Sequence, residues 1–183
     1  MDNGASSYRR FLDGDEGAFE EIMLGYRDGL TFFIDGFVHD TMVAEDIAID
    51  VFTYLLVNPK KYDFSVSLKT YLYMLGRSRA LDHLRYRKRR STVDISAADA
   101  DAADRDSLEA EILADERSRL INRALEKLPE KMRTAVYLIF FEGLSYEETA
   151  RVMRLNRKQV DNLLYRAKGQ LRLIIGEEGV LWI

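Results

Sequence analysis

Apolar residues recur along most of this chain at the three- and four-residue spacing of helices that bury one face. The first such run predicts one helix, with a buried face made of Phe11, Ala18, Phe19, Ile22, Met23, Tyr26 and Leu30. A second run predicts a helix that begins near Thr41, with a stripe of Val43, Ile47, Val51, Tyr54 and Leu55. Asn58 ends it, because the residue before a proline disfavours helical geometry. A third predicted helix covers 68–90, apolar in its first part and strongly basic at its end.

Beyond residue 90 the helical pattern stops. Residues 91–106 carry almost no bulky apolar side chains, so they cannot bury enough area to offset the entropy lost on ordering. We therefore expect a flexible acidic linker over 91–117. Within it, Ser107 is suited to cap the start of a connecting helix that reaches Leu128.

The punctuation of two further helices follows. Pro129 suits the first helical position of a helix that is predicted to run to Glu142 and to end at Gly143. Ser145 and Glu148 then predict a capping box, in which each side chain satisfies a backbone N–H at the start of a new helix.

A short turn around Leu155 separates that helix from the next one, which Asn156 can cap and which is predicted over 156–172. Ala150 is small, as is needed where two helices cross closely. The inward positions of the last helix are Val160, Leu163, Leu164, Ala167 and Leu171. Its outward positions are Arg157, Lys158, Asp161, Asn162, Tyr165, Arg166 and Lys168.

Two short helices with a turn of three or four residues, the second basic and polar, are typical of a helix-turn-helix. The second helix of that motif enters the major groove, where Arg and Asn contact base edges and Lys or Arg contact phosphates. The sequence therefore predicts DNA binding by 156–172. The alternative is a helical hairpin whose charged face is only solvated.

Taken together, the elements predict an all-α protein of two small helical domains. A four-helix domain over 6–90 is followed by the acidic linker and by a domain over 118–175 that carries the helix-turn-helix. The composition agrees, since 183 residues with 47% apolar content, 11 Gly and only 2 Pro suit two small helical cores.

The same composition narrows the chemistry. The absence of cysteine excludes disulfides, thiolate metal sites and cysteine nucleophiles, and His39 and His83 lie far apart in the sequence. No apolar run approaches the roughly 20 residues that span a bilayer. The polar, acidic start is unlike a signal peptide. We expect a cytoplasmic protein without a metal, a cofactor, a small-molecule substrate or a membrane-inserted segment.

Charge is segregated along the chain although the net charge is only −4. Residues 1–63 hold five basic and 13 acidic side chains, and residues 64–90 hold eight basic and one acidic. Residues 91–117 hold two basic and nine acidic, and residues 118–183 hold 12 basic and eight acidic. Alternating blocks of charge favour separate surfaces for separate partners, although ordinary surface charge is the simpler alternative.

The basic block at the end of the third helix is a second candidate for nucleic-acid binding. Its cations suit phosphates, and they are Arg77, Arg85, Arg87, Lys88, Arg89 and Arg90. Aromatic residues near them in the sequence suit the stacking of unpaired bases, namely Tyr62, Phe64, Tyr71, Tyr73 and Tyr86. A solvated helix end beside core aromatics is the alternative.

A third cluster lies in the second helix, where Glu45, Asp46 and Asp50 precede Phe52. Neighbouring carboxylates on a helix point in different directions, and no histidine or glycine-rich loop supports them as a metal or acid–base site. A surface that docks another protein, or a plain solvated face, is favoured. No nucleophile with a base is found, so we do not expect an enzyme.

These clusters, in this order, resemble the ECF (extracytoplasmic function) sigma factors of the bacterial sigma-70 family. The matching segments are DEGAFEEI (15–22) with region 2.1, AEDIAIDVF (44–52) with region 2.2, LKTYLYMLGRSRALDHLR (68–85) with regions 2.3 and 2.4, LEKLPEKMR (125–133) with region 4.1, and GLSYEETA (143–150) with region 4.2. The resemblance covers nearly the whole chain apart from the linker and the tail.

The resemblance implies a transcription initiation factor that binds core RNA polymerase and directs it to promoters. Contacts to the polymerase, through its β′ clamp helices and β flap, would include Glu45, Asp46, Asp50 and Phe52. Contacts to the −10 element and its phosphates would include Tyr62, Phe64, Arg77, Ser78, Arg85, Lys88 and Arg89. Contacts to the −35 element would include Arg157, Lys158, Asp161, Asn162, Tyr165 and Arg166. An anti-sigma factor is a further expected partner.

Some positions depart from the family pattern. Ile49 stands where Gln is usual, which would remove one polar contact to polymerase. Tyr71 replaces Trp and keeps an aromatic ring, whereas Ser78 replaces Asn, a change that bears on base reading. Asp161 and Asn162 stand where a basic residue and then Ser or Asn are typical, and an acid there can accept a hydrogen bond from cytosine N4.

Two other functions remain open at this stage. A stand-alone helix-turn-helix regulator would bind operator DNA without polymerase, and it predicts dimerisation. A helical adaptor would bind only proteins and would leave the basic faces unused. The apolar end, Val180 to Ile183, is expected either to fold back on the second domain or to contact another molecule.

Overall fold

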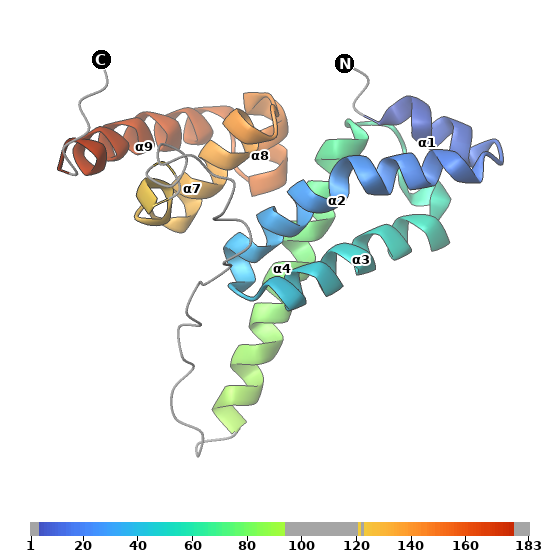
Figure 1. Ribbon diagram of the computed structural model, residues 1–183, viewed down its shortest axis with the longest axis horizontal. Helices are drawn as coiled ribbons and strands as arrows, with labels where there is room; N and C mark the ends of the chain where they lie inside the picture. The colour runs from blue at the N-terminus through green and yellow to red at the C-terminus, as the bar shows by residue number, and fades with distance from the viewer. Residues whose placement is uncertain (1–3, 94–120, 122, 178–183) are drawn as a thin grey trace.

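The computed structural model describes residues 4–93, 121 and 123–177 (Figure 1). Every regular element in these ranges is a helix, which confirms the all-α fold class. In chain order the elements are α1 (Ala5–Leu12), α2 (Glu16–Val38), α3 (Thr41–Val57), a 3-10 turn (Pro59–Lys61), α4 (Leu68–Val93), α7 (Glu130–Val136), a π turn (Tyr137–Phe141), α8 (Tyr146–Met153) and α9 (Arg157–Glu177). The predicted linker beyond Val93, the predicted cap at Ser107 and the apolar tail lie outside the described residues.

The first predicted helix is in fact two helices, which corrects the sequence-based expectation. α1 ends at Leu12, and Gly14 adopts φ 98°, a left-handed conformation that glycine tolerates and other residues do not. Asp15 then starts α2, because its carboxylate accepts a hydrogen bond from the Ala18 N–H at 3.3 Å. The apolar spacing continued across this break and concealed it.

The next boundaries follow from local capping. α2 ends where His39 turns left-handed at φ 55°, and Asp40 caps α3 by accepting the Val43 N–H at 3.1 Å. α3 ends at Val57, and the Asn58 side chain donates to the Tyr54 carbonyl oxygen at 3.1 Å. The predicted end of this helix before Pro59 is therefore confirmed.

Helices α1 to α4 enclose the core of the first domain. Its fully buried large side chains include Tyr8, Ile22, Leu30, Ile34, Val51, Phe52, Leu55, Leu68, Leu72 and Tyr73. The Tyr8 hydroxyl donates to the Pro59 carbonyl oxygen at 2.8 Å, which ties α1 to the turn that follows α3. The second half of α4 extends beyond the other helices of this domain (Figure 1).

The second domain has the predicted helix-turn-helix. The capping box is confirmed, since Ser145 accepts the Glu148 N–H at 3.2 Å and Glu148 accepts the Ser145 N–H at 2.9 Å. Gly143 has φ 68° and closes the preceding segment as expected. That segment differs from the prediction in its last turn, which widens into the π turn instead of continuing as an α-helix.

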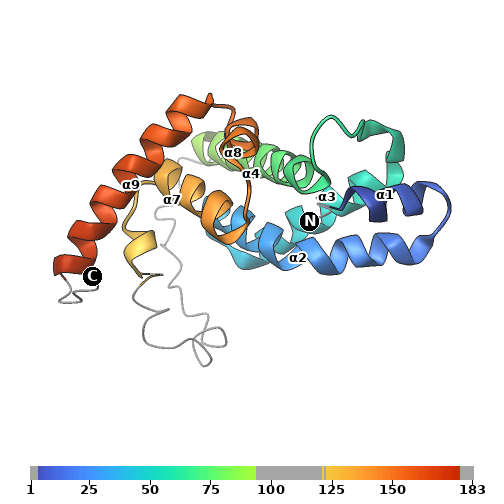
Figure 2. The same ribbon diagram turned by 90° about the horizontal axis from the view of Figure 1, so that it is seen from above.

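The two domains pack against each other. α8 crosses the first half of α4, and α7 lies beside α2 (Figures 1 and 2). The buried apolar side chains of both domains form one continuous core. The polar centre of this contact is described below.

Candidate nucleic-acid interface

The outward face of α9 carries the six residues predicted to contact the −35 element, and all six are exposed: Arg157, Lys158, Asp161, Asn162, Tyr165 and Arg166. Tyr165 is the most open of the large hydrophobic side chains, at 81% exposure. Val160, Leu164 and Ala167 are buried on the opposite face, as the spacing predicted. The helix thus presents a polar, partly cationic surface without giving up any core position.

The start of α9 is fixed by a second reciprocal cap. Asn156 accepts the Gln159 N–H at 2.9 Å, and Gln159 accepts the Asn156 N–H at 2.8 Å. Arg154 in the turn is left-handed, at φ 55°, and donates its N–H back to the end of α8. Arg157 pairs with Glu147 at 3.1 Å, which links the two helices of the motif. Asn156 is therefore the cap that the sequence predicted, and α9 continues five residues beyond the predicted end, to Glu177.

The basic end of α4 is exposed from Arg85 to Arg90. Arg85 is 2.7 Å from Asp82, an i,i+3 pair that offsets part of its charge. Tyr86 is 55% exposed, and the Arg90 guanidinium lies 5.8 Å from the centre of its ring. Cations and an aromatic side chain therefore share this end of the helix, the combination that suits an unpaired nucleic-acid strand.

Arg77 and Ser78, earlier on α4, are only half-exposed. Burial lowers the pKa of Arg77, and the positive charge of Arg154 in the second domain lowers it further. The contact between the domains therefore brings two guanidinium groups toward each other, which opposes their packing.

Tyr62 is a core residue, and this corrects its predicted place among the DNA contacts. It is 3% exposed, and its hydroxyl donates to the Val66 carbonyl oxygen at 2.7 Å. Its ring centre lies 5.2 Å from that of Tyr8, 4.6 Å from Phe64 and 5.2 Å from Tyr71. Phe64 is half-exposed, with the Arg9 guanidinium 5.0 Å from its ring centre. Sequence proximity to the basic block did not distinguish the anchoring ring from the accessible one.

α3 presents the predicted acidic face. Glu45, Asp46 and Asp50 are exposed, and Ile49 among them is 53% exposed. Asp50 lies 3.7 Å from Arg79 of α4, which fixes its position. Phe52, predicted as a polymerase contact, is 2% exposed and belongs to the core, so in this conformation it cannot touch a partner.

Five residues that the sequence did not single out meet at the centre of the domain contact, and we call them the Glu142 cluster: Gly29, Lys69, Tyr73, Tyr137 and Glu142. Lys69 Nζ lies 2.8 Å from Glu142 Oε2, with only 20% and 12% of the two side chains exposed. The Tyr137 hydroxyl lies 2.8 Å from Glu142 Oε1 and 3.1 Å from the Gly29 carbonyl oxygen. A buried ion pair is thus shared between α4 and the end of the π turn.

The pKa of Glu142 reflects two opposing effects. Burial alone raises the pKa of this carboxyl, but Lys69, Tyr73 and Tyr137 together lower it below its ordinary value of 4.5. Burial also raises the pKa of the Tyr73 and Tyr137 hydroxyls, and the Glu142 carboxylate raises both further. The Tyr73 hydroxyl is fully buried and aligns with no acceptor as a hydrogen bond.

Glu148 links the same two domains from α8. Its Oε1 accepts hydrogen bonds from Ser67 at 2.8 Å and from Thr70 at 3.0 Å, while its Oε2 caps its own helix at Ser145. Thr70 is fully buried as a result. A glutamate in a capping box is predictable from sequence, but its second set of partners, about 80 residues away, is not.

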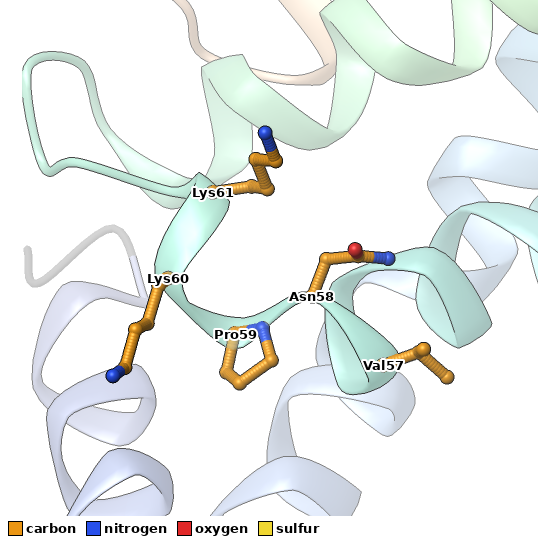
Figure 3. A pocket seen from close by; sticks show the side chains of 5 residues that line it. All are labelled: Val57, Asn58, Pro59, Lys60 and Lys61. Carbon is orange, nitrogen blue, oxygen red and sulfur yellow. The ribbon is translucent and has the colours of Figure 1, made fainter.

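A hollow of about 490 Å³ lies beside the turn after α3 (Figure 3). It is lined by Val57, Asn58, Pro59, Lys60 and Lys61. All five belong to one stretch of chain, and Figure 3 shows Lys60 and Lys61 pointing in different directions. The hollow therefore does not gather groups from several elements as a catalytic site does.

Within the described residues, no group of three His, Asp or Glu side chains is placed to hold a metal ion. No helix in the same part of the chain is long and apolar enough to cross a membrane. Exposed charge on α3, α4 and α9 is the chemistry that these residues offer.

Two parts of the chain match models of known families. Residues 24–90 match Sigma-70 region 2, and residues 118–171 match Sigma-70, region 4. The RNA polymerase sigma-H factor of Pseudomonas aeruginosa is 33% identical over 167 residues, covering 87% of this chain and 86% of the relative. The ECF RNA polymerase sigma factor SigW of Bacillus subtilis is 28% identical over 173 residues, covering 87% and 89%. The chain belongs to the ECF group of the sigma-70 family.

This ECF sigma factor also shares its fold with a solved structure. The sigma factor RpoE from Bartonella quintana, solved in complex with the anti-sigma factor NepR, superposes with a TM-score of 0.69 at 20% identity. The match covers 86% of this chain and 96% of that one.

Membership of the family decides between the functions left open by the sequence. The chain is a transcription initiation factor that directs RNA polymerase to promoters. Region 2 contains α3 and nearly all of α4, and region 4 contains α7, α8 and most of α9. A stand-alone regulator would leave region 2 unexplained, so that alternative is not favoured.

Tyr62 and Tyr86 should respond oppositely to truncation. Tyr62→Ala should lower the free energy of unfolding by about 3 kcal/mol or more, because it empties a packed aromatic site. Tyr86→Ala should change stability by less than about 0.5 kcal/mol, because its ring is mostly in solvent. Urea unfolding followed by circular dichroism measures both, and equal losses would contradict this assignment.

Acid should weaken the domain contact through Glu142. Its pKa in the folded protein is lowered, so its contribution to stability is complete above its ordinary value of 4.5 and is lost as the pH falls below it. We expect the melting temperature to fall more between about pH 6 and pH 4 in the wild type than in Glu142→Gln. Parallel curves for the two proteins would show that Glu142 does not carry this dependence.

Proposed function

We propose that this sigma factor contacts promoter DNA through two surfaces, the outward face of α9 and the second half of α4. The observation that supports this most is their exposure, because both carry Arg and Lys side chains that the core does not need. The α9 face would contact the −35 element and the α4 surface the −10 element. We take the corresponding domains to be 118–175 and 6–90.

Within α9 the roles divide by side-chain chemistry. Arg157, Lys158 and Arg166 are suited to phosphates and to guanine edges. Asp161 and Asn162 are suited to base edges, an acid to cytosine N4 and an amide to adenine. Tyr165 adds an exposed ring that can pack on the thymine methyl group or on the sugar-phosphate backbone.

Within region 2 the proposed −10 contacts are reduced by one. Arg85, Lys88 and Arg89 would contact phosphates, and Arg77 and Ser78 would approach the bases. Phe64 is the half-exposed ring that is left to stack an unpaired base once Tyr62 is assigned to the core.

The acidic face of α3 is the proposed polymerase contact, through Glu45, Asp46 and Asp50. The partner surfaces on core RNA polymerase would be the β′ clamp helices and the β flap. Ile49 at the centre of this face adds an apolar contact where a polar one is usual in the family. Because the protein works with polymerase, we place it in the cytoplasm and assign it no catalytic step of its own.

An anti-sigma factor is a further proposed partner. The Bartonella quintana sigma factor that shares this fold was solved in complex with one. Regulation of the present chain by such a protein would be reversed when the partner is removed.

Run-off transcription with purified core polymerase and genomic DNA fragments tests the proposal directly. Substituting Arg85, Lys88 and Arg89 together by Ala should reduce promoter-dependent transcripts at least tenfold, because three phosphate contacts are lost, and should make the yield less sensitive to salt. The matched control removes the same charge at Arg27, Arg123 and Lys131, which are exposed elsewhere. Equal losses in both triple variants would contradict a specific role for the end of α4.

Asp161 tests the proposed −35 contact. Asp161→Ala should change which base is preferred at one −35 position, with about 1–3 kcal/mol of discrimination lost there. Selection of active promoters from a library randomised over the −35 element measures the preference. An unchanged preference would remove Asp161 from the base contacts, whereas a uniform gain at every sequence would indicate only relief of phosphate repulsion.

A further inference from the structure

The domain contact covers the helix that the proposed function assigns to the −10 element. α8 lies across the first half of α4, where Ser67 and Thr70 donate to Glu148 and Lys69 pairs with Glu142. Thr70 has no exposed surface, and Arg77 further along is half-buried toward Arg154. A DNA strand that follows this part of α4 would have to displace α8.

The contact has a specific polar construction. The shared carboxylate of Glu142 accepts from Lys69 of one domain and Tyr137 of the other, and Tyr137 also reaches the Gly29 carbonyl oxygen. Two arginines of the second domain donate to backbone carbonyl oxygens of the first, Arg133 to Gly36 and Arg151 to Ser65, both at 3.3 Å. Directional bonds of this kind hold one arrangement of the domains in preference to others.

Other features of the same contact oppose it. Arg77 and Arg154 carry like charges across the contact, and the Tyr73 hydroxyl is buried without a hydrogen bond. A buried ion pair also contributes little net stability, because removing both charges from water offsets most of their attraction. The balance is one that a binding partner with a preference for the separated domains can reverse.

We propose that the Glu142 cluster and Glu148 hold this sigma factor in an autoinhibited closed form, in which α8 withholds the first half of α4 from promoter DNA until the domains separate. The proposal rests on the assignment of α4 to the −10 element. The closed form needs no second protein, since every group that holds it belongs to this chain. Polymerase binding would supply the free energy of opening, because its sites for the two regions favour separated domains.

Gly29 gives a selective way to test the contact. A Cβ atom added at Gly29 would lie 2.7 Å from Glu142 Oε1 and 2.8 Å from the Tyr73 hydroxyl, both closer than real contacts allow. Neither atom can move aside without breaking the Glu142 cluster, since Glu142 is held by Lys69 and Tyr137. A Cβ atom added at Gly25 in the same helix would meet nothing within 4 Å, so this position is the matched control.

The experiment compares Gly29→Ala, Gly25→Ala and Glu142→Gln in the full chain. Because the sequence has no cysteine, Leu24→Cys and Leu173→Cys place two spin labels on exposed sites of α2 and α9 without background labelling. Electron paramagnetic resonance then gives the distance distribution between the domains. We expect a narrow distribution in the wild type and in Gly25→Ala, and a broader, longer one in Gly29→Ala and Glu142→Gln.

The same proteins are titrated with a fluorescein-labelled, mixed-sequence single-stranded DNA. If closure masks α4, the two opening variants should bind at least about fivefold more tightly than Gly25→Ala, because a larger fraction of molecules is competent to bind. Unchanged distances in both opening variants would overturn the proposed contact, and opening without tighter binding would overturn its inhibitory role. The distance measurement does not depend on DNA binding, so failure of the proposed −10 assignment would be distinguishable from failure of the closed form.

Discussion

A carboxylate removed from water needs compensating partners, and Glu142 finds one of them, Lys69, only in the other domain. That requirement organises much of the described structure. It joins the end of the π turn to α4, brings α8 across the start of that helix, and makes one continuous core out of two small ones. If the pair were broken on one side, the remaining charge would be buried without a partner. The arrangement of the domains therefore depends on keeping both members together or exposing both.

The local features of the fold were largely predictable from sequence, because their causes are local. The capping box of Ser145 and Glu148, the cap at Asn156 and the end of α3 before Pro59 each involve residues within four positions of one another. The break at Gly14 was missed because the apolar spacing is the same on both sides of it, so periodicity outweighed the turn residues. The π turn was missed because nothing in its composition separates it from an α-helical turn.

The candidate site was predictable in its chemistry and less so in its exposure. The outward face of α9 follows from its inward face, since a helix that buries Val160, Leu164 and Ala167 must present the positions between them. Tyr62 and Phe52 were misjudged because aromatic type and sequence neighbourhood do not reveal which rings pack on each other. The Glu142 cluster was invisible for a further reason. Its members come from three helices and a turn, and no spacing along the chain relates them.

The two reciprocal caps that flank the turn before α9 have a consequence for how this protein can change. Ser145 with Glu148 and Asn156 with Gln159 fix both helix starts through side chains that point along the chain. Beyond Arg157, which pairs with Glu147, the outward residues of α9 take no part in these caps, so they can be exchanged without altering the geometry of the motif. Recognition and folding are encoded in largely separable sets of residues, which makes this helix a suitable place to build promoter orthogonality into an otherwise unchanged factor.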